Sequence, residues 1–86
     1  MIEKQVTIVN ESGLHAKPAS QVVNFVRNYK GQVLVFSEGK RGNLKSIISI
    51  LSLGLRKGDT IRIQIEGDGE HEFAEELVDF IASLEG

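Results

Sequence analysis

The 86-residue sequence contains no cysteine, no tryptophan and a single proline. Without cysteine, a disulfide framework and thiolate chemistry are excluded. No apolar run approaches the roughly 20 residues that a membrane-spanning helix needs. The first nine residues alternate charged and apolar side chains and lack the basic segment and apolar run of a signal peptide. We therefore expect a cytoplasmic protein with no membrane insertion.

The composition is that of a small folded domain. Hydrophobic residues make up 41% and charged residues 26% of the chain, which is typical of globular proteins and unlike disordered ones. The chain is too short for two hydrophobic cores. No linker, repeat or low-complexity segment interrupts it, so residues 1–86 are expected to form a single domain.

Charge is divided unevenly along the chain. Residues 1–65 hold all 10 Lys and Arg and four of the 12 acids, a net charge of +6, whereas residues 66–86 hold the other eight acids, a net charge of −8. The acids near the C-terminus are typical of a solvated helix face. The basic part favours an acidic partner or a phosphate. Nucleic acid is disfavoured because the isoelectric point is only 5.6 and no aromatic residues are interleaved with the basic ones.

Hydrophobic periodicity predicts seven elements in an α+β domain. Alternating apolar and polar residues predict strands, and apolar residues at helical spacing predict helices. Ser46 is a favoured N-cap for the short helix over 47–53, and Gly54 suits the position just after it. The elements are a first strand containing Ile2, Val6 and Ile8, a helix over 16–28, strands over 33–37 and 40–43, a helix over 47–53, a strand over 60–66 and a helix over 70–84.

Two histidines are candidates for chemistry. His71 begins an acid-rich helix, and we expect it to be an exposed surface residue without a catalytic role. His15 lies between a Gly-containing turn and the start of a helix, where the free backbone N–H groups of Ala16 and Lys17 and the helix dipole favour an anion. An imidazole at that position could hold a phosphoryl group, with its oxygens met by these donors. A plain polar helix cap remains the alternative.

Two motifs resemble those of the HPr family of histidine-containing phosphocarrier proteins. Gly13-Leu-His-Ala-Lys-Pro-Ala19 is similar to the family's active-site motif, and Asn43-Leu-Lys-Ser-Ile47 followed by Leu51-Ser-Leu-Gly54 is similar to its second signature. The resemblance extends over essentially the whole chain. It implies an open-faced β-sandwich, in which a four-stranded antiparallel sheet carries three helices on one face in the order β-α-β-β-α-β-α.

The same resemblance implies a function. His15 would accept phosphate at Nδ1 from phospho-Enzyme I and pass it to the sugar-specific EIIA components of the phosphoenolpyruvate-dependent sugar transport system. Such a carrier is an intermediate in phosphotransfer rather than an enzyme with its own turnover, and it needs no cofactor. Lys17 stands where the family usually has Arg. Lysine keeps the positive charge that attracts phosphate, but it cannot make the two parallel hydrogen bonds of a guanidinium group.

Ser46 has two interpretations. It caps a predicted helix, and it also matches the serine that HPr kinase/phosphorylase phosphorylates in many family members, where the phosphorylated form binds a transcription factor of catabolite repression. The resemblance places partner contacts at Ile47, Ile48 and Leu51. At two of these positions, 48 and 51, such proteins often have the more adaptable methionine.

Three functions therefore remain open. The first is a phosphoryl carrier, the second is a regulatory module that acts mainly through Ser46, and the third is a small-molecule-binding domain with an incidental histidine. Relatives of the second kind tend to lack the histidine, so His15 favours the carrier. No cluster of His, Asp or Glu has metal-ligand spacing.

Strand parity leaves a few apolar side chains on the predicted open face of the sheet. They are Val9, Leu34 and Phe36. Isolated exposed apolar residues are common and need no explanation. The alternative is weak self-association through this face of a protein that is mostly monomeric.

Overall fold

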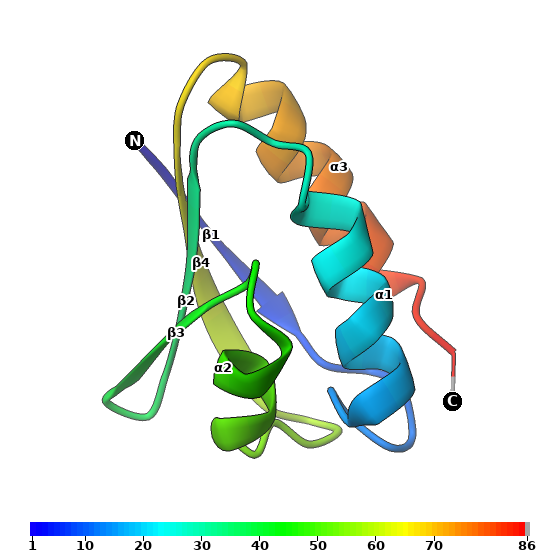
Figure 1. Ribbon diagram of the computed structural model, residues 1–86. Coiled ribbons are helices and arrows are strands. Elements are labelled where there is room, and N and C mark those ends of the chain that lie inside the picture. Colours follow the sequence, from blue (N-terminus) through cyan, green and yellow to red (C-terminus); the bar gives the residue numbers. More distant parts are fainter. Residues whose placement is uncertain (86) are drawn as a thin grey trace.

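The computed structural model describes residues 1–85 and contains the seven predicted elements in the predicted order (Figure 1). They are β1 (Ile2–Thr7), α1 (Ala16–Val26), β2 (Gln32–Ser37), β3 (Lys40–Asn43), α2 (Ile47–Ser52), β4 (Thr60–Glu66) and α3 (Glu70–Ala82). Both long helices are two residues shorter than predicted. After α1, the Tyr29 N–H bonds the Val26 carbonyl in a tight turn, and after α3 the Ser83 hydroxyl donates to the Phe80 carbonyl at 2.8 Å.

The strands form one antiparallel sheet in the order β1-β4-β2-β3. All three helices cover the same face of this sheet, and the other face is open (Figure 1). The predicted open-faced β-sandwich is therefore confirmed. The β2–β3 hairpin turns through Glu38 and Gly39, which both have positive φ, at 50° and 80°. Such a two-residue turn matches the natural twist of paired strands.

Strand register directs the β-branched side chains toward the helices. Val6 lies opposite Ile61, and Val35 lies opposite Ile63, so the inward positions of three strands form one apolar layer. The helices complete the core with buried side chains, which include Ala19, Val22, Val26, Ile50, Ala74, Leu77 and Ile81. The core therefore fixes the faces of α1 and α3 that point at the sheet, and it leaves the N-terminal end of α1 at the surface.

The open face of the sheet is partly covered by its own polar side chains. Leu34 and Phe36 lie on this face, as predicted, but both are half-buried. Phe36 lies opposite Arg62 on β4, whose guanidinium carbon is 5.1 Å from the centre of the Phe36 ring. This cation–π contact covers part of the apolar surface that the sequence leaves exposed.

Candidate functional site

His15 is the N-cap residue of α1. Its backbone is extended (φ −85°, ψ −166°), and its carbonyl accepts the first helical hydrogen bond, from the Ala19 N–H at 2.8 Å. The side chain is exposed and makes no capping bond. Most N-cap side chains satisfy a free backbone donor of their helix. His15 does not, so its imidazole remains available for chemistry at the surface.

The first turn of α1 presents unused donors beside this imidazole. Pro18 has no N–H and the Ala19 N–H is bonded to His15, so the Ala16 and Lys17 N–H groups are the ones left without a partner among the described residues. The helix dipole adds partial positive charge at this end. The exposed Lys17 side chain adds a full charge. The structure thus brings together His15, Ala16 and Lys17, the three residues predicted to hold a phosphoryl group.

A tightly packed loop sets the position of His15. Gly13 has φ +65°, and a Cβ at this residue would lie 2.3 Å from the Leu55 carbonyl oxygen. The next residue, Leu14, donates its N–H to the same oxygen at 3.1 Å and buries its side chain. The buried Asn10 side chain donates to the Gly13 carbonyl at 2.6 Å. The loop before His15 is therefore held against the segment after α2, a support that no local sequence pattern indicates.

The basic residues of the first 65 positions do not all gather at His15. Arg56 follows Leu55 and lies against Gly13, so it belongs to this end of the molecule. Lys57 donates to the Glu11 carboxylate at 2.7 Å, and this contact lowers the pKa of that carboxyl. Lys45, in contrast, donates to the Tyr29 carbonyl just beyond the C-terminal end of α1. The positive charge of Lys45 therefore lies near the C-terminal end of α1, away from His15 at the N-terminal end.

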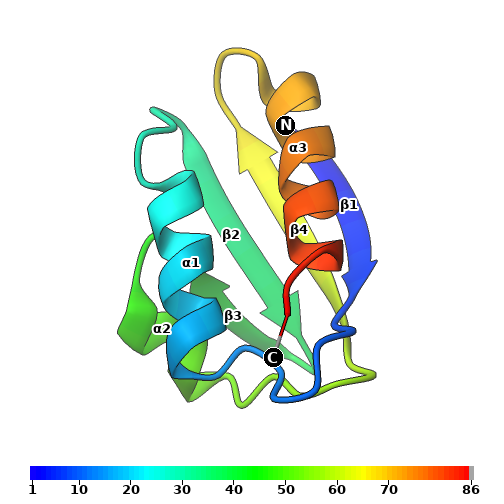
Figure 2. The ribbon, with the colours of Figure 1, turned by 90° about the vertical axis from the view of Figure 1, so that its right-hand side faces the viewer.

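Helix α2 lies beside the N-terminal half of α1 (Figure 2). Ser46 caps it as predicted, with its hydroxyl oxygen accepting from the Ser49 N–H at 3.2 Å. Three of its apolar side chains are exposed, with Ile48 at 80%, Leu51 at 40% and Ile47 at 39%. Contiguous exposed apolar surface is typical of contact sites. The partner residues predicted on α2 thus form an apolar surface at the same end of the molecule as His15.

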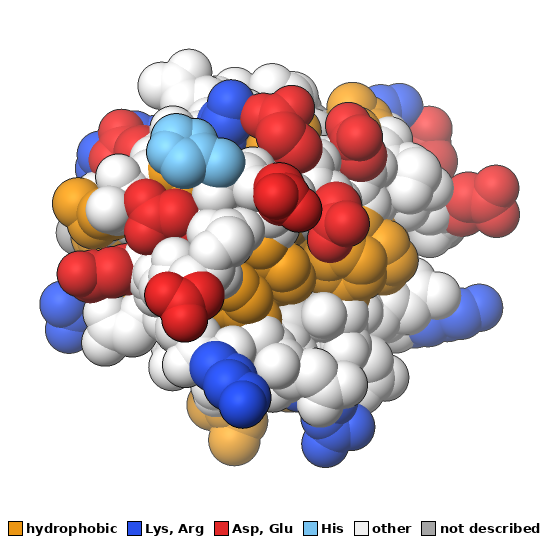
Figure 3. Space-filling model, turned by 90° about the horizontal axis from the view of Figure 1, so that it is seen from above, with side chains coloured by type: hydrophobic (Ala, Val, Ile, Leu, Met, Phe, Trp, Pro, Cys, Tyr) orange, Lys and Arg blue, Asp and Glu red, His pale blue; other side chains and the backbone are white. Residues whose placement is uncertain are grey.

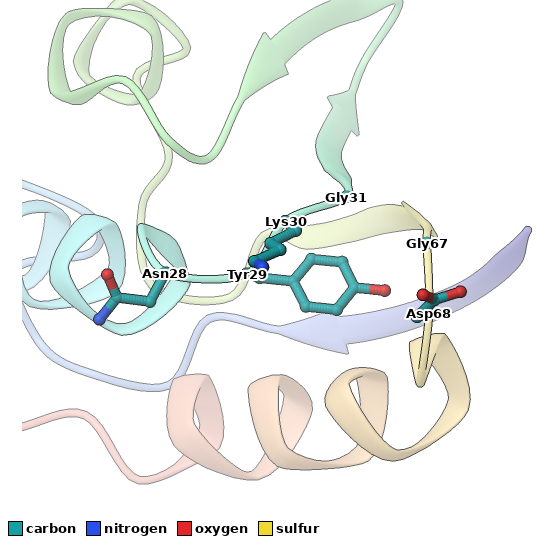
Figure 4. A pocket seen from close by; sticks show the side chains of 6 residues that line it. All are labelled: Asn28, Tyr29, Lys30, Gly31, Gly67 and Asp68. Atoms are coloured by element: carbon teal, nitrogen blue, oxygen red, sulfur yellow. The ribbon is translucent and has the colours of Figure 1, made fainter.

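A hollow of about 490 Å³ lies at the far end of α1 (Figure 4). Six residues line it: Asn28, Tyr29, Lys30, Gly31, Gly67 and Asp68. The Tyr29 hydroxyl points toward the Gly67–Asp68 turn and has no hydrogen-bond partner among the described residues. Burial, together with the charges of Glu70 and Asp68, raises the pKa of this hydroxyl. Neither histidine lines the hollow, so it is separate from the site at His15.

Comparisons with known proteins settle the family. Residues 2–83 match the family described as "PTS HPr component phosphorylation site". The chain belongs to the HPr family. It is 39% identical over 84 residues to the phosphocarrier protein HPr of Vibrio cholerae, covering 98% of this chain and 99% of the relative. It is 37% identical over 81 residues to the HPr-like protein Crh of Halalkalibacterium halodurans, covering 94% and 96%.

Solved HPr structures have the same fold. A crystal structure of HPr-C-His from Thermoanaerobacter tengcongensis is 40% identical in sequence and superimposes with a TM-score of 0.91, covering 96% of this chain and 93% of the other. An HPr dimer from the same organism also matches, with 40% identity, a TM-score of 0.74 and coverage of 96% and 95%. Within residues 1–85, none of the helices has the length and apolar character needed to cross a membrane.

Proposed function

We propose that this chain carries a phosphoryl group on His15 as the HPr component of a phosphotransferase system. The observation that supports the proposal most strongly is the N-cap position of His15, whose exposed imidazole lies beside the unused N–H groups of Ala16 and Lys17. An incidental histidine cap would use its side chain to bond the helix. This one leaves both the imidazole and the helix donors available to a phosphoryl group.

The residues divide the transfer step between them. A lone pair on one imidazole nitrogen of His15 attacks phosphorus, the bond from phosphorus to the donor breaks, and the donor leaves with that electron pair. Phosphoryl transfer of this kind depends mainly on positioning and on stabilising the charge of the equatorial oxygens. We assign that stabilisation to the two backbone N–H groups and to the Lys17 ammonium. Family resemblance makes Nδ1 the attacking atom.

Lys17 is the departure from the family pattern with the clearest chemical consequence. Arg grips phosphate with two parallel hydrogen bonds, whereas Lys acts as a flexible point charge. At the start of α1 the backbone donors already fix part of the phosphoryl geometry. We therefore expect Lys17 to support transfer with less geometric control than Arg would give.

The apolar surface of α2 is the proposed docking site for the phosphotransferase partners. Exposed Ile47, Ile48 and Leu51 lie at the same end of the molecule as His15. A partner that covers them would approach the phosphoryl site at the same time. The family implies Enzyme I as the donor and EIIA domains as acceptors.

Regulation through Ser46 is the second candidate, favoured by the similarity to an HPr-like Crh protein and by the place of Ser46 beside this surface. A phosphate there would add about −1.5 to −2 charge beside exposed Ile47 and Ile48. HPr kinase/phosphorylase would add it, and a catabolite-control transcription factor would read it. A chain that worked only through Ser46 would have no use for the unengaged imidazole at position 15.

Incubation with phosphoenolpyruvate and Enzyme I, followed by intact-mass measurement, tests the main proposal. We expect one acid-labile phosphate on the parent chain and none on His15→Ala. The second candidate predicts an acid-stable phosphate after incubation with HPr kinase/phosphorylase and ATP, absent in Ser46→Ala. Acid stability distinguishes the two modifications because phosphohistidine hydrolyses in acid and phosphoserine does not. A parent chain that takes no phosphate from Enzyme I would overturn the carrier role.

A further inference from the structure

Helices α1 and α3 lie side by side over the sheet, and α2 lies on the other side of α1 (Figure 2). Residues of α1 and α3 together line a shallow groove. It consists of two overlapping hollows of about 570 and 340 Å³, which share Phe25 and Phe80. The residues that line them are Gln21, Asn24 and Phe25 from α1, and Glu76, Asp79, Phe80 and Ser83 from α3. The groove is therefore separate from the α2 surface that the proposed function uses.

Its floor belongs to a stack of aromatic rings, with Phe25 on α1, Phe73 and Phe80 on α3, and Tyr29 in the turn after α1. The Phe80 and Phe25 ring centres are 4.4 Å apart, those of Phe25 and Phe73 are 5.8 Å apart, and those of Phe73 and Tyr29 are 4.2 Å apart. All four rings are half-buried. Stacking against one another restricts their movement. Phe25 and Phe80 line the hollows, so the groove has a preformed apolar floor.

One wall of the groove is acidic. Glu76 and Asp79 are exposed and lie three residues apart on α3, and neither makes an ion pair among the described residues. No Lys or Arg lines the two hollows. Two cations lie at its ends. Arg27, just after α1, donates to Asn24 at 3.2 Å, and Lys17 lines an adjoining hollow toward His15 that shares Gln21, Phe80 and Ser83 with the groove and also contains Glu85. Figure 3 shows a band of hydrophobic side chains with acidic side chains along one side.

We propose that this groove is a docking site for a cationic amphipathic helix of a partner protein. A helix with apolar side chains on one face would cover the aromatic floor, as helices do in grooves of this kind. Its Lys or Arg side chains would meet the Glu76 and Asp79 carboxylates and relieve their mutual repulsion. An acidic or phosphorylated segment would meet repulsion instead. Because α1 separates the groove from α2, a partner bound here leaves the α2 surface uncovered.

The test uses the full chain and three synthetic helical peptides of about 15 residues. The first has leucine on one face and lysine on the other, the second has glutamate in place of lysine, and the third has serine in place of leucine. Amide resonances of the labelled protein report the site. We expect the leucine–lysine peptide to shift the resonances of Phe25, Glu76 and Phe80. The other two peptides should bind at least about tenfold more weakly.

A pair of charge-matched variants separates the groove from general attraction between opposite charges. Glu76→Lys with Asp79→Lys should weaken binding of the leucine–lysine peptide at least about tenfold, whereas Glu38→Lys with Glu66→Lys, at exposed positions elsewhere, should change it less than about twofold. Equal losses in the two variants would overturn the proposal, as would equal binding of the leucine–glutamate peptide or shifts confined to α2. Sedimentation of the parent as a dimer that Glu76→Lys with Asp79→Lys dissociates would assign the groove to a second copy and also overturn it.

Discussion

Replacing Gly13 by alanine should damage both stability and phosphotransfer, because this residue holds His15 through contacts made far away in the sequence. Gly13 has φ +65°, and the added Cβ would lie 2.3 Å from the Leu55 carbonyl oxygen and 2.7 Å from the Arg56 Cα. Both neighbours are backbone atoms, so they cannot rotate away as a side chain would. The loop before His15 must therefore move off the segment after α2.

The expected cost combines two parts. Holding alanine in the left-handed region costs about 1–2 kcal/mol. Displacing the loop weakens the 3.1 Å bond from the Leu14 N–H to Leu55, worth about 0.5–1.5 kcal/mol. With some exposure of the Leu14 side chain, the free energy of unfolding should fall by about 2–4 kcal/mol. For a domain of this size, each kcal/mol lowers the melting temperature by about 4–8 °C, so the expected fall is about 8–32 °C.

Gly39→Ala is the matched control. Gly39 also has positive φ, at +80°, but apart from its own chain neighbours no residue lies within 4 Å of the position its Cβ would occupy. This variant should lose only the left-handed cost of about 1–2 kcal/mol and keep the parent transfer rate. Thermal unfolding followed by circular dichroism, and transfer from phospho-Enzyme I at a temperature where both variants are folded, measure the two effects. Equal stability losses, or parent-like transfer in Gly13→Ala, would refute the claim that the loop contact positions His15.

Four further outcomes are expected. His15→Ala should take up no acid-labile phosphate, as intact mass would show, and uptake at the parent level would disprove the assignment. Lys17→Arg should keep or raise the rate of transfer from phospho-Enzyme I, and Lys17→Glu should lower it at least about tenfold; equal rates in Lys17→Glu and the parent would contradict the electrostatic argument. Ser46→Asp should weaken Enzyme I docking, measured by calorimetry, more than it lowers thermal stability, and the reverse ranking would exclude that role. Leu34→Ser with Phe36→Ser should reduce any dimer fraction seen by sedimentation and leave phosphorylation intact; a parent that stays monomeric up to millimolar concentration would remove the self-association hypothesis.

Local patterns predict the elements of this chain well, because each element carries its own periodicity. The strand over 60–66 alternates strictly, and the structure places it at Thr60–Glu66. The strand at Lys40–Asn43 and the cap at Ser46 also agree. Helix ends are predicted less well, since apolar spacing continues through Leu84 although α3 ends at Ala82. Leu84 packs against the core from outside the helix, and periodicity alone does not separate these two cases.

The long-range contacts of the site could not be predicted from such patterns. The motif identifies His15, Lys17 and Pro18, but the support of Gly13 comes from Leu55, which lies 42 residues further along the chain. Local patterns also do not predict the strand order, which places β4 between β1 and β2. Nor do they predict the cation–π contact in which Arg62 covers Phe36. In each case the decisive neighbour is set by strand pairing or loop packing.

The uneven distribution of charge along the sequence produces two different electrostatic environments around α1. Its N-terminal end is positive, and the side that faces α3 is negative. Several cations of the first 65 residues are engaged away from His15, with Lys4 paired to Glu75 and Lys45 bonded beyond the C-terminal end of α1. If the proposed function holds, we expect Lys17 and the free donors of α1 to supply much of the local attraction for a phosphoryl group. Exposed Glu76 and Asp79 should repel anions along the α3 side. A phosphorylated donor that approaches α1 should then be attracted to its N-terminal end and repelled from α3. We therefore expect a donor to approach from the α2 side, where the exposed apolar residues lie. A donor that docks there would align with His15 in the same step.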